Sequence, residues 1–105
     1  MNVDELSGTA LNEAVAKCLG IVHIRHQGQV VDRFGNPLMY IDDWSLAGEI
    51  IERECIELQH WGAHSVPWSA WIDEKHHHYG TTPLIAAMRC FVASKQGEQD
   101  ANEDL

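Results

Sequence analysis

Basic residues are scarce in this chain. Seven Lys and Arg stand against sixteen Asp and Glu among 105 residues, so the formal net charge is −9. A surface with this excess of negative charge repels nucleic-acid phosphates and anionic lipid headgroups. We therefore expect neither direct contact with nucleic acid nor binding to a membrane.

The chain has no long hydrophobic run, and we expect no secretory signal. No stretch approaches the ~20 apolar residues that span a bilayer, and residues 1–5 are acidic where a signal peptide would be basic. The three cysteines, Cys18, Cys55 and Cys90, are odd in number and lie far apart among apolar neighbours. This pattern favours buried free thiols in a reducing compartment over a disulfide framework. We expect a cytoplasmic protein.

The motifs of common catalytic and cofactor sites are absent. The sequence contains no HExxH, paired CxxC, EF-hand, GxGxxG, GxxxxGK[ST] or GxSxG pattern. Cys55 and Cys90 occupy helix positions that we expect to face the core, where a thiol is inert. The sequence therefore predicts no catalytic residue, no cofactor and no enzyme activity.

The clearest element that is present is a helix near the C-terminus. Thr81 or Thr82 can cap its first turn, Pro83 suits its first position, and Gly97 suits the residue just past its end. The apolar residues between these signals fall at the spacing of one buried helical face: Leu84, Ala87, Met88, Phe91 and Val92.

Two further helices are expected earlier in the chain. One begins at residue 3 or 8 and ends at residue 19, before a glycine, and the other begins after Asp42 or Asp43, either of which can cap it. The apolar spacing of the second helix predicts that Trp44 and Cys55 lie on its buried face.

Strands are predicted between the second and the last helix. Residues 56–60 and 68–73 alternate apolar and polar side chains, and residues 75–79 can add a third strand. The first two segments are too close in sequence for a helical crossover, so they must pair antiparallel. Residues 21–24 and 30–31 could form short strands, with turns marked by Gly28, Gly35 and Pro37, but we expect mostly irregular connection over residues 21–41.

This order of elements predicts an α+β fold in which a small antiparallel sheet of two to four strands is covered by about three helices. The length fits a single domain. We assign residues 1–97 to this domain and interpret residues 98–105, which are rich in Asp and Glu, as an acidic, disordered tail.

Four segments of the chain carry a family resemblance. They are LSGTALNEAVAKCLG at 6–20, DW leading to GEIIERE within 43–54, WSA at 68–70, and TPLIAAMR at 82–89. In this order they resemble the NinX-like family of phage and prophage proteins, whose function is not established. More loosely, the layout is similar to phage α-β-α sandwich domains. The resemblance implies a phage or prophage accessory protein made in the bacterial cytoplasm, and it carries over no catalytic residue.

A run of three histidines raises the possibility of a metal site. On a strand, His76 and His78 would project from the same face about 7 Å apart, and His60 or His64 could approach from a neighbouring strand or turn. Such a set, completed by a nearby carboxylate, could bind a divalent metal ion. The alternative is an exposed histidine cluster without function, because a bare histidine run is a weak motif. The run is not part of the family pattern.

Three tryptophans surround the predicted strand pair. Alternation places Trp68 and Trp71 on opposite faces of the sheet, and Trp61 lies close by in sequence. At least one of them can lie outside the core and anchor a protein contact or a dimer. Packing beneath a neighbouring loop is the alternative.

The leading hypothesis is a small acidic phage accessory protein that binds a host protein, a phage protein or its own copies without catalysis. One alternative is a metal-dependent enzyme or metal-binding protein that uses the histidine-rich strand. Another is an acidic mimic of nucleic acid that occupies a DNA-binding host protein.

Overall fold

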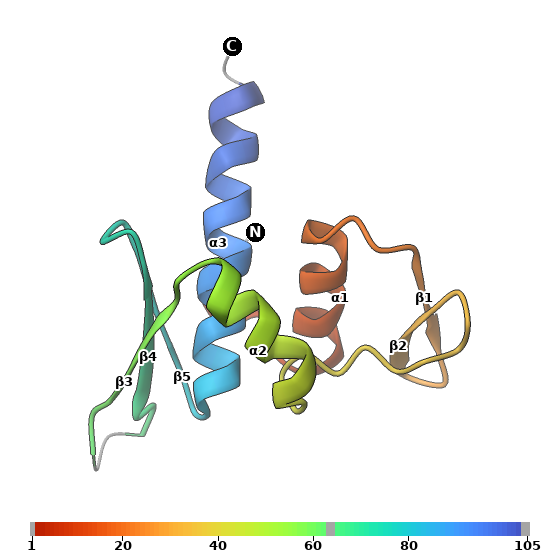
Figure 1. Cartoon of the computed structure of the whole chain (residues 1–105), viewed down its shortest axis with the longest axis horizontal. Coiled ribbons are helices and arrows are strands. Elements are labelled where there is room, and N and C mark those ends of the chain that lie inside the picture. Colours follow the sequence, from red (N-terminus) through yellow and green to blue (C-terminus); the bar gives the residue numbers. More distant parts are fainter. Residues whose placement is uncertain (1, 63–64, 104–105) are drawn as a thin grey trace.

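A computed structural model describes residues 2–62 and 65–103, with side chains as far as Gln96. Three α-helices, a short 3-10 turn and two small antiparallel sheets make up this part of the chain, so the α+β prediction is confirmed (Figure 1). The elements, in chain order, are η1 (Val3–Glu5), α1 (Gly8–Cys18), β1 (His23–His26), β2 (Gln29–Asp32), α2 (Trp44–Arg53), β3 (Glu57–His60), β4 (Trp68–Ile72), β5 (His76–Gly80) and α3 (Pro83–Glu103).

Helix α3 is the central element of the fold. It lies between the three-stranded sheet on one side and α1 and α2 on the other (Figure 1). The predicted apolar face is buried, and Ala86 and Cys90, which lie outside that face, are buried as well. The helix therefore contributes to the core around most of its circumference.

The start of α3 follows the sequence signals, and its end does not. The Thr82 hydroxyl accepts a hydrogen bond from the Ile85 amide at 3.2 Å, and Pro83 is the first helical residue. The prediction that the helix ends before Gly97 is wrong, because α3 continues to Glu103. A glycine inside a helix costs about 1 kcal/mol relative to alanine, which weakens a helix without stopping it. Of the predicted tail, the backbone of 98–103 thus belongs to α3, and residues 104–105 lie outside the described residues.

The three predicted strands pair antiparallel in the order β3-β4-β5. Ala70 and Ile72 of β4 are buried against α3, which covers one face of this sheet. In the part of the chain that the structure describes, no helix or strand covers the opposite face (Figure 1). We call this opposite face the outer face.

Residues 21–41 contain two short strands at slightly different bounds from the stretches where the sequence allowed them, and the remaining residues form the expected turns and irregular connection. Strands β1 and β2 form a hairpin whose turn residues, Gln27 and Gly28, have φ values of 52° and 79°. Two consecutive positive φ values are typical of the tight turns that match the twist of a hairpin. Gln27 is a poor signal for such a turn, since Asn or Asp is usual there. The hairpin lies beyond α1, far from the other sheet (Figure 1).

Helix α2 begins as expected but buries a different face. Asp43 caps it, accepting a hydrogen bond from the Ser45 amide at 2.9 Å. Trp44 and Cys55 were expected in the core, and both are exposed, Trp44 to 54%. Trp44 is the first residue of the helix and lies before the residues that are buried in the core, Ala47 and Ile50. Cys55 follows the end of the helix with a φ of 54°, which turns its side chain off the helix face.

Arg89 ties α3 to both neighbouring segments of the chain. Its guanidinium group donates hydrogen bonds to the Leu6 carbonyl at 3.0 Å and to the Tyr79 carbonyl at 2.8 Å. His78 adds a second link, because its Nδ1 lies 2.8 Å from the Asp4 carboxylate. The N-terminal segment is therefore joined to β5 and to α3 by polar contacts between residues more than 70 positions apart.

The close packing of β5 on α3 makes a testable prediction at Gly80. A Cβ atom at this position would lie 2.6 Å from the Ala86 amide nitrogen and 2.9 Å from Ile85 Cγ2. Gly80→Ala should lower the free energy of unfolding by about 1–3 kcal/mol, because the backbone of α3 must shift. The matched control is Gly48→Ala within α2, where nothing lies within 4 Å of the added methyl group. That change should stabilise the protein by about 0.5–1 kcal/mol. Urea unfolding measures both, and equal effects would contradict this packing.

Candidate functional site

The outer face of the β3-β4-β5 sheet carries the most distinctive group of side chains. Strand pairing aligns Glu57 with Trp71 and Trp71 with His77 in one row, and Ser69 with Tyr79 in the next. Because side chains alternate along a strand, all of these point away from α3.

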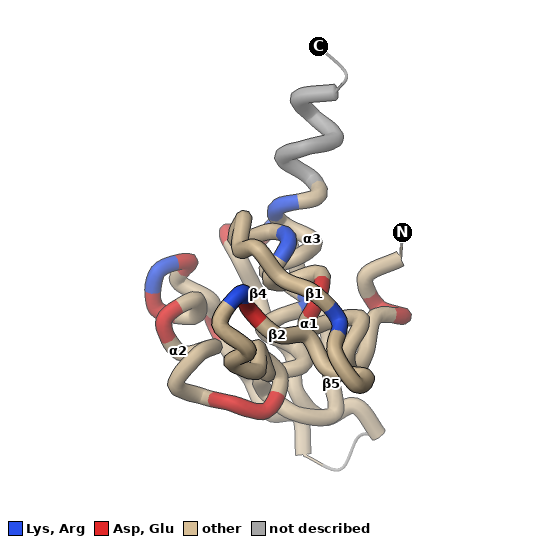
Figure 2. The backbone as a smooth tube through the Cα atoms, turned by 90° about the vertical axis from the view of Figure 1, so that its right-hand side faces the viewer, with Lys and Arg blue, Asp and Glu red and all other residues tan. Residues whose placement is uncertain are grey.

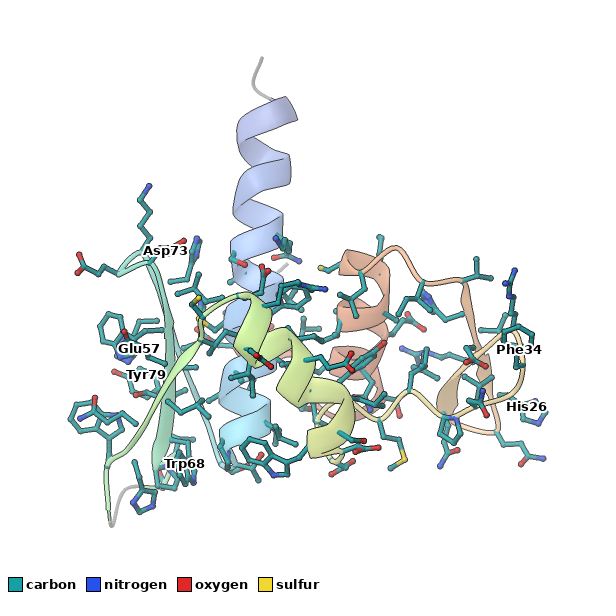
Figure 3. The ribbon with its side chains drawn as sticks, in the orientation of Figure 1. His26, Phe34, Glu57, Trp68, Asp73 and Tyr79 are labelled. Atoms are coloured by element: carbon teal, nitrogen blue, oxygen red, sulfur yellow. The ribbon has the colours of Figure 1, made fainter. Side chains whose placement is uncertain are left out.

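Three aromatic rings form a continuous cluster on this face. The rings of Trp71 and His77 are stacked, with centroids 3.5 Å apart and an angle of 12° between the planes. The His77 ring meets Tyr79 at 4.6 Å. Tyr79 is 44% exposed, and Figure 3 places it on the side of the sheet away from α3. We call Trp71, His77 and Tyr79 the aromatic cluster.

Trp61 extends the aromatic surface beyond β3. Its indole N–H donates a hydrogen bond of 2.7 Å to the Ser69 hydroxyl, and the indole ring remains 42% exposed. The amide of Trp61 is bonded to the Pro67 carbonyl at 2.6 Å, which holds the two ends of this connection together. Ser69 is fully buried although it points to the outer face.

The third predicted tryptophan lies on the other side of the sheet. Trp68 packs against the core and meets the His60 ring at 4.8 Å. The expectation that Trp68 and Trp71 occupy opposite faces is confirmed. Of the three predicted contact residues, Trp61 and Trp71 therefore share the outer face. Trp68 lies on the opposite face of the sheet, against the core.

A hollow of about 750 Å³ opens at the β3 edge of this sheet. Leu58 and Trp71 supply apolar lining, and Glu57, Asp73 and Glu74 place three carboxylates around it. Asp73 and Glu74 form the β4–β5 turn with φ values of 53° and 63°. Glutamate is an unusual choice for a left-handed turn position. Sequence reasoning considered Asp73 and Glu74 only as possible carboxylate ligands for the histidine metal site.

One comparison with known proteins places the chain in a family. The family model described as "Bacteriophage P22, NinX" matches residues 2–95, which include the whole sheet and most of α3. The chain belongs to the NinX family of bacteriophage P22. No curated protein matches this NinX family member. The family description names a phage protein and no reaction, so the activity has to be argued from the surface.

Two of the histidines considered for a metal site in this NinX family member have ring partners, and for the third only a backbone contact is seen. His60 contacts Trp68, His78 is bonded to Asp4, and the backbone carbonyl of His76 accepts a hydrogen bond from the Cys90 thiol at 3.2 Å. Among the residues that the structure describes, no three His, Cys, Asp or Glu side chains are grouped to hold a metal ion. His64 lies outside those residues.

The thiols differ in their exposure. All three cysteines are free. Burial raises the pKa of the Cys90 thiol to about 12, and partial burial raises the pKa of Cys18. Both therefore stay protonated at neutral pH, and a protonated thiol is a poor nucleophile. Cys55, in contrast, is exposed beside the acidic hollow.

No helix in the described part of this NinX family member is both long enough and apolar enough to cross a membrane.

His77 and Tyr79 are the site residues that sequence reasoning missed. The metal hypothesis concentrated on His76 and His78, which lie on one face of β5. The aromatic cluster uses His77 and Tyr79, which lie on the opposite face. The signal was available, because His77 and Tyr79 are two positions apart and therefore share a strand face with each other.

The stacked histidine makes stability depend on pH. Nε2 of His77 is buried, and no hydrogen-bond partner for it exists within the described structure. Burial, followed by the nearby His78, lowers the pKa of His77 below its usual value near 6.5. As pH falls below about 6.5, the unfolded chain binds a proton at this position more readily than the folded chain, so folding is weakened. Between pH 7.5 and pH 5.5, the free energy of unfolding of the His77→Phe variant should fall less than that of the parent protein. Urea unfolding at each pH measures both values.

Tyr79→Phe provides the control for this comparison. It keeps His77 and an aromatic neighbour, so it should retain the pH dependence of the parent protein. Identical slopes of stability against pH for the parent and His77→Phe would contradict the role given to His77.

Proposed function

We propose that this phage protein acts without catalysis, by binding another protein through the outer face of its three-stranded sheet. The observation that carries the proposal is the aromatic cluster of Trp71, His77 and Tyr79 on a face that no described helix or strand covers.

The physical properties of this cluster suit a binding surface. Tryptophan and tyrosine supply large contact areas and polar groups, and they are enriched among the residues that dominate binding energy. Stacking already restricts Trp71 and His77 in the free protein, and the strands are held by α3 from behind. Little side-chain freedom remains to be lost when a partner binds, which favours affinity.

The proposal assigns no reaction to the chain. It is supported by the buried, protonated thiol of Cys90 and by the polar contacts that engage His78 within the fold. The three free cysteines favour a reducing compartment, so we place the protein in the cytoplasm of the bacterial host. The partner is a host protein, a phage protein or a second copy of the chain, and the net charge of −9 favours basic surfaces over nucleic acid.

The test compares one double variant of the sheet with one single variant elsewhere, all with aromatic residues replaced by threonine. Trp71→Thr with Tyr79→Thr removes two of the three rings of the aromatic cluster and keeps residues that favour strands. Trp44→Thr removes a more exposed tryptophan from α2. Each protein is used to retain partners from a lysate of infected bacteria, followed by quantitative mass spectrometry. Loss of two central aromatic side chains should weaken a specific complex at least tenfold.

We expect proteins retained in stoichiometric amounts by the parent and by Trp44→Thr to be lost with the sheet variant. Equal retention by both variants would contradict the assignment of the outer face. Circular dichroism and thermal unfolding identify any variant that fails to fold.

A further inference from the structure

The two ends of the molecule carry unlike surfaces. The β1–β2 hairpin lies at one end of the longest axis, and the three-stranded sheet lies at the other (Figure 1). Figure 3 shows Phe34 and His26 at the hairpin end and Glu57, Asp73 and Tyr79 at the sheet end. Neither end is covered by another described element.

The hairpin end projects an aromatic side chain next to a cation. Phe34 is 76% exposed, more than any other large apolar side chain described, and the Arg33 guanidinium lies 5.0 Å from the centre of its ring. The Asp32 carboxylate fixes this turn by accepting hydrogen bonds of 2.9 Å from the amides of Phe34 and Asn36. We call Arg33 and Phe34 the knob. Its backbone is held in place before any partner binds.

Exposed apolar residues continue from the knob along the hairpin. Val22 and Ile24 are both largely exposed, and they line a second hollow, of about 340 Å³, on the hairpin. An exposed apolar patch of this kind on a small acidic protein is typical of an interaction surface.

Charge is divided unevenly between the two ends. Residues 21–41 contain two arginines and one aspartate, whereas the rest of the chain contains fifteen acidic and five basic residues. Figure 2 faces the hairpin end and shows basic segments on β1 and beside β2. Arg25 is paired with Glu13 of α1 at 2.7 Å, so the exposed Arg33 is the cation that this hairpin offers to a negatively charged copy.

The acidic hollow at the β3 edge offers matching chemistry. Within the described residues, the carboxylates of Glu57, Asp73 and Glu74 make no hydrogen bond or ion pair, and Leu58 and Trp71 provide apolar contact between them. Strand β3 is the edge of its sheet, so its outward backbone groups are free to pair. The hollow thus combines negative charge, an aromatic wall and an open strand edge.

We propose that the knob of one copy binds in the acidic hollow of a second copy, so that the chain assembles head to tail. Phe34 would contact Leu58 and Trp71, and Arg33 would face the three carboxylates. The inference rests on the proposed function, since it names a second copy as an occupant of the sheet end. Because the two surfaces differ, an assembly of any length leaves one knob open at one end and one hollow open at the other, and it grows by addition at its ends.

Two variants, each of which disables one of the two surfaces, test the head-to-tail assembly directly. Arg33→Glu with Phe34→Ser removes the knob, and Glu57→Lys with Glu74→Lys reverses charge around the hollow. All four residues are exposed, so the fold should persist, and circular dichroism checks this. Analytical ultracentrifugation at low and moderate salt measures the mass of each protein and of an equimolar mixture.

We expect the mass of the parent protein to rise with concentration, and to rise less at higher salt, where charge attraction is screened. Each variant alone should self-associate at least tenfold more weakly than the parent protein. The mixture should form a dimer and nothing larger, because one intact knob meets one intact hollow. The matched control, Glu49→Lys with Glu52→Lys on α2, changes the net charge by the same amount and should assemble like the parent.

Three results would overturn the inference. They are a parent protein that stays monomeric at all concentrations, a mixture that is no larger than its components, and a control that loses assembly as fully as the hollow variant. If the parent is monomeric but still retains proteins through Trp71 and Tyr79, this inference fails and the proposed function stands. If both measurements are negative, both fail.

Discussion

The burial of α3 is the constraint on which the rest of the structure depends. Its apolar residues extend around most of the helix, so elements must pack on several sides of it. The three-stranded sheet covers one side, and α1 and α2 cover another. In a chain of 105 residues, little remains to form a second layer over the sheet. The outer face and the hairpin end are left open as a consequence of this arrangement.

Elements determined by short-range signals could be predicted from the sequence. The Thr82 cap and Pro83 fix the start of α3, Asp43 fixes the start of α2, and alternation fixes the three strands. The same alternation separated Trp68 from Trp71 correctly. These features depend on neighbouring residues alone, which is why a single sequence is enough to find them.

The features that escaped prediction depend on distant residues. The sequence allows two short strands around Gly28, but their pairing depends on burial of Val30 against the core and on Leu38, whose amide bonds the Val30 carbonyl. The contacts of His78 with Asp4 and of Arg89 with Leu6 join parts of the chain that no local pattern connects. The acidic hollow likewise arises where the end of α2, β3 and the β4–β5 turn meet.

The central claim is that the outer face of the sheet is where this phage protein meets its partner. The most direct measurement replaces Tyr79 with a photoreactive phenylalanine analogue in infected bacteria, and compares it with the same replacement of Trp44, which is at least as exposed. The account predicts a discrete covalent adduct with a protein, either another copy or a different chain, from position 79 and none from position 44. Adducts of equal yield from both positions, or none from position 79, would contradict it.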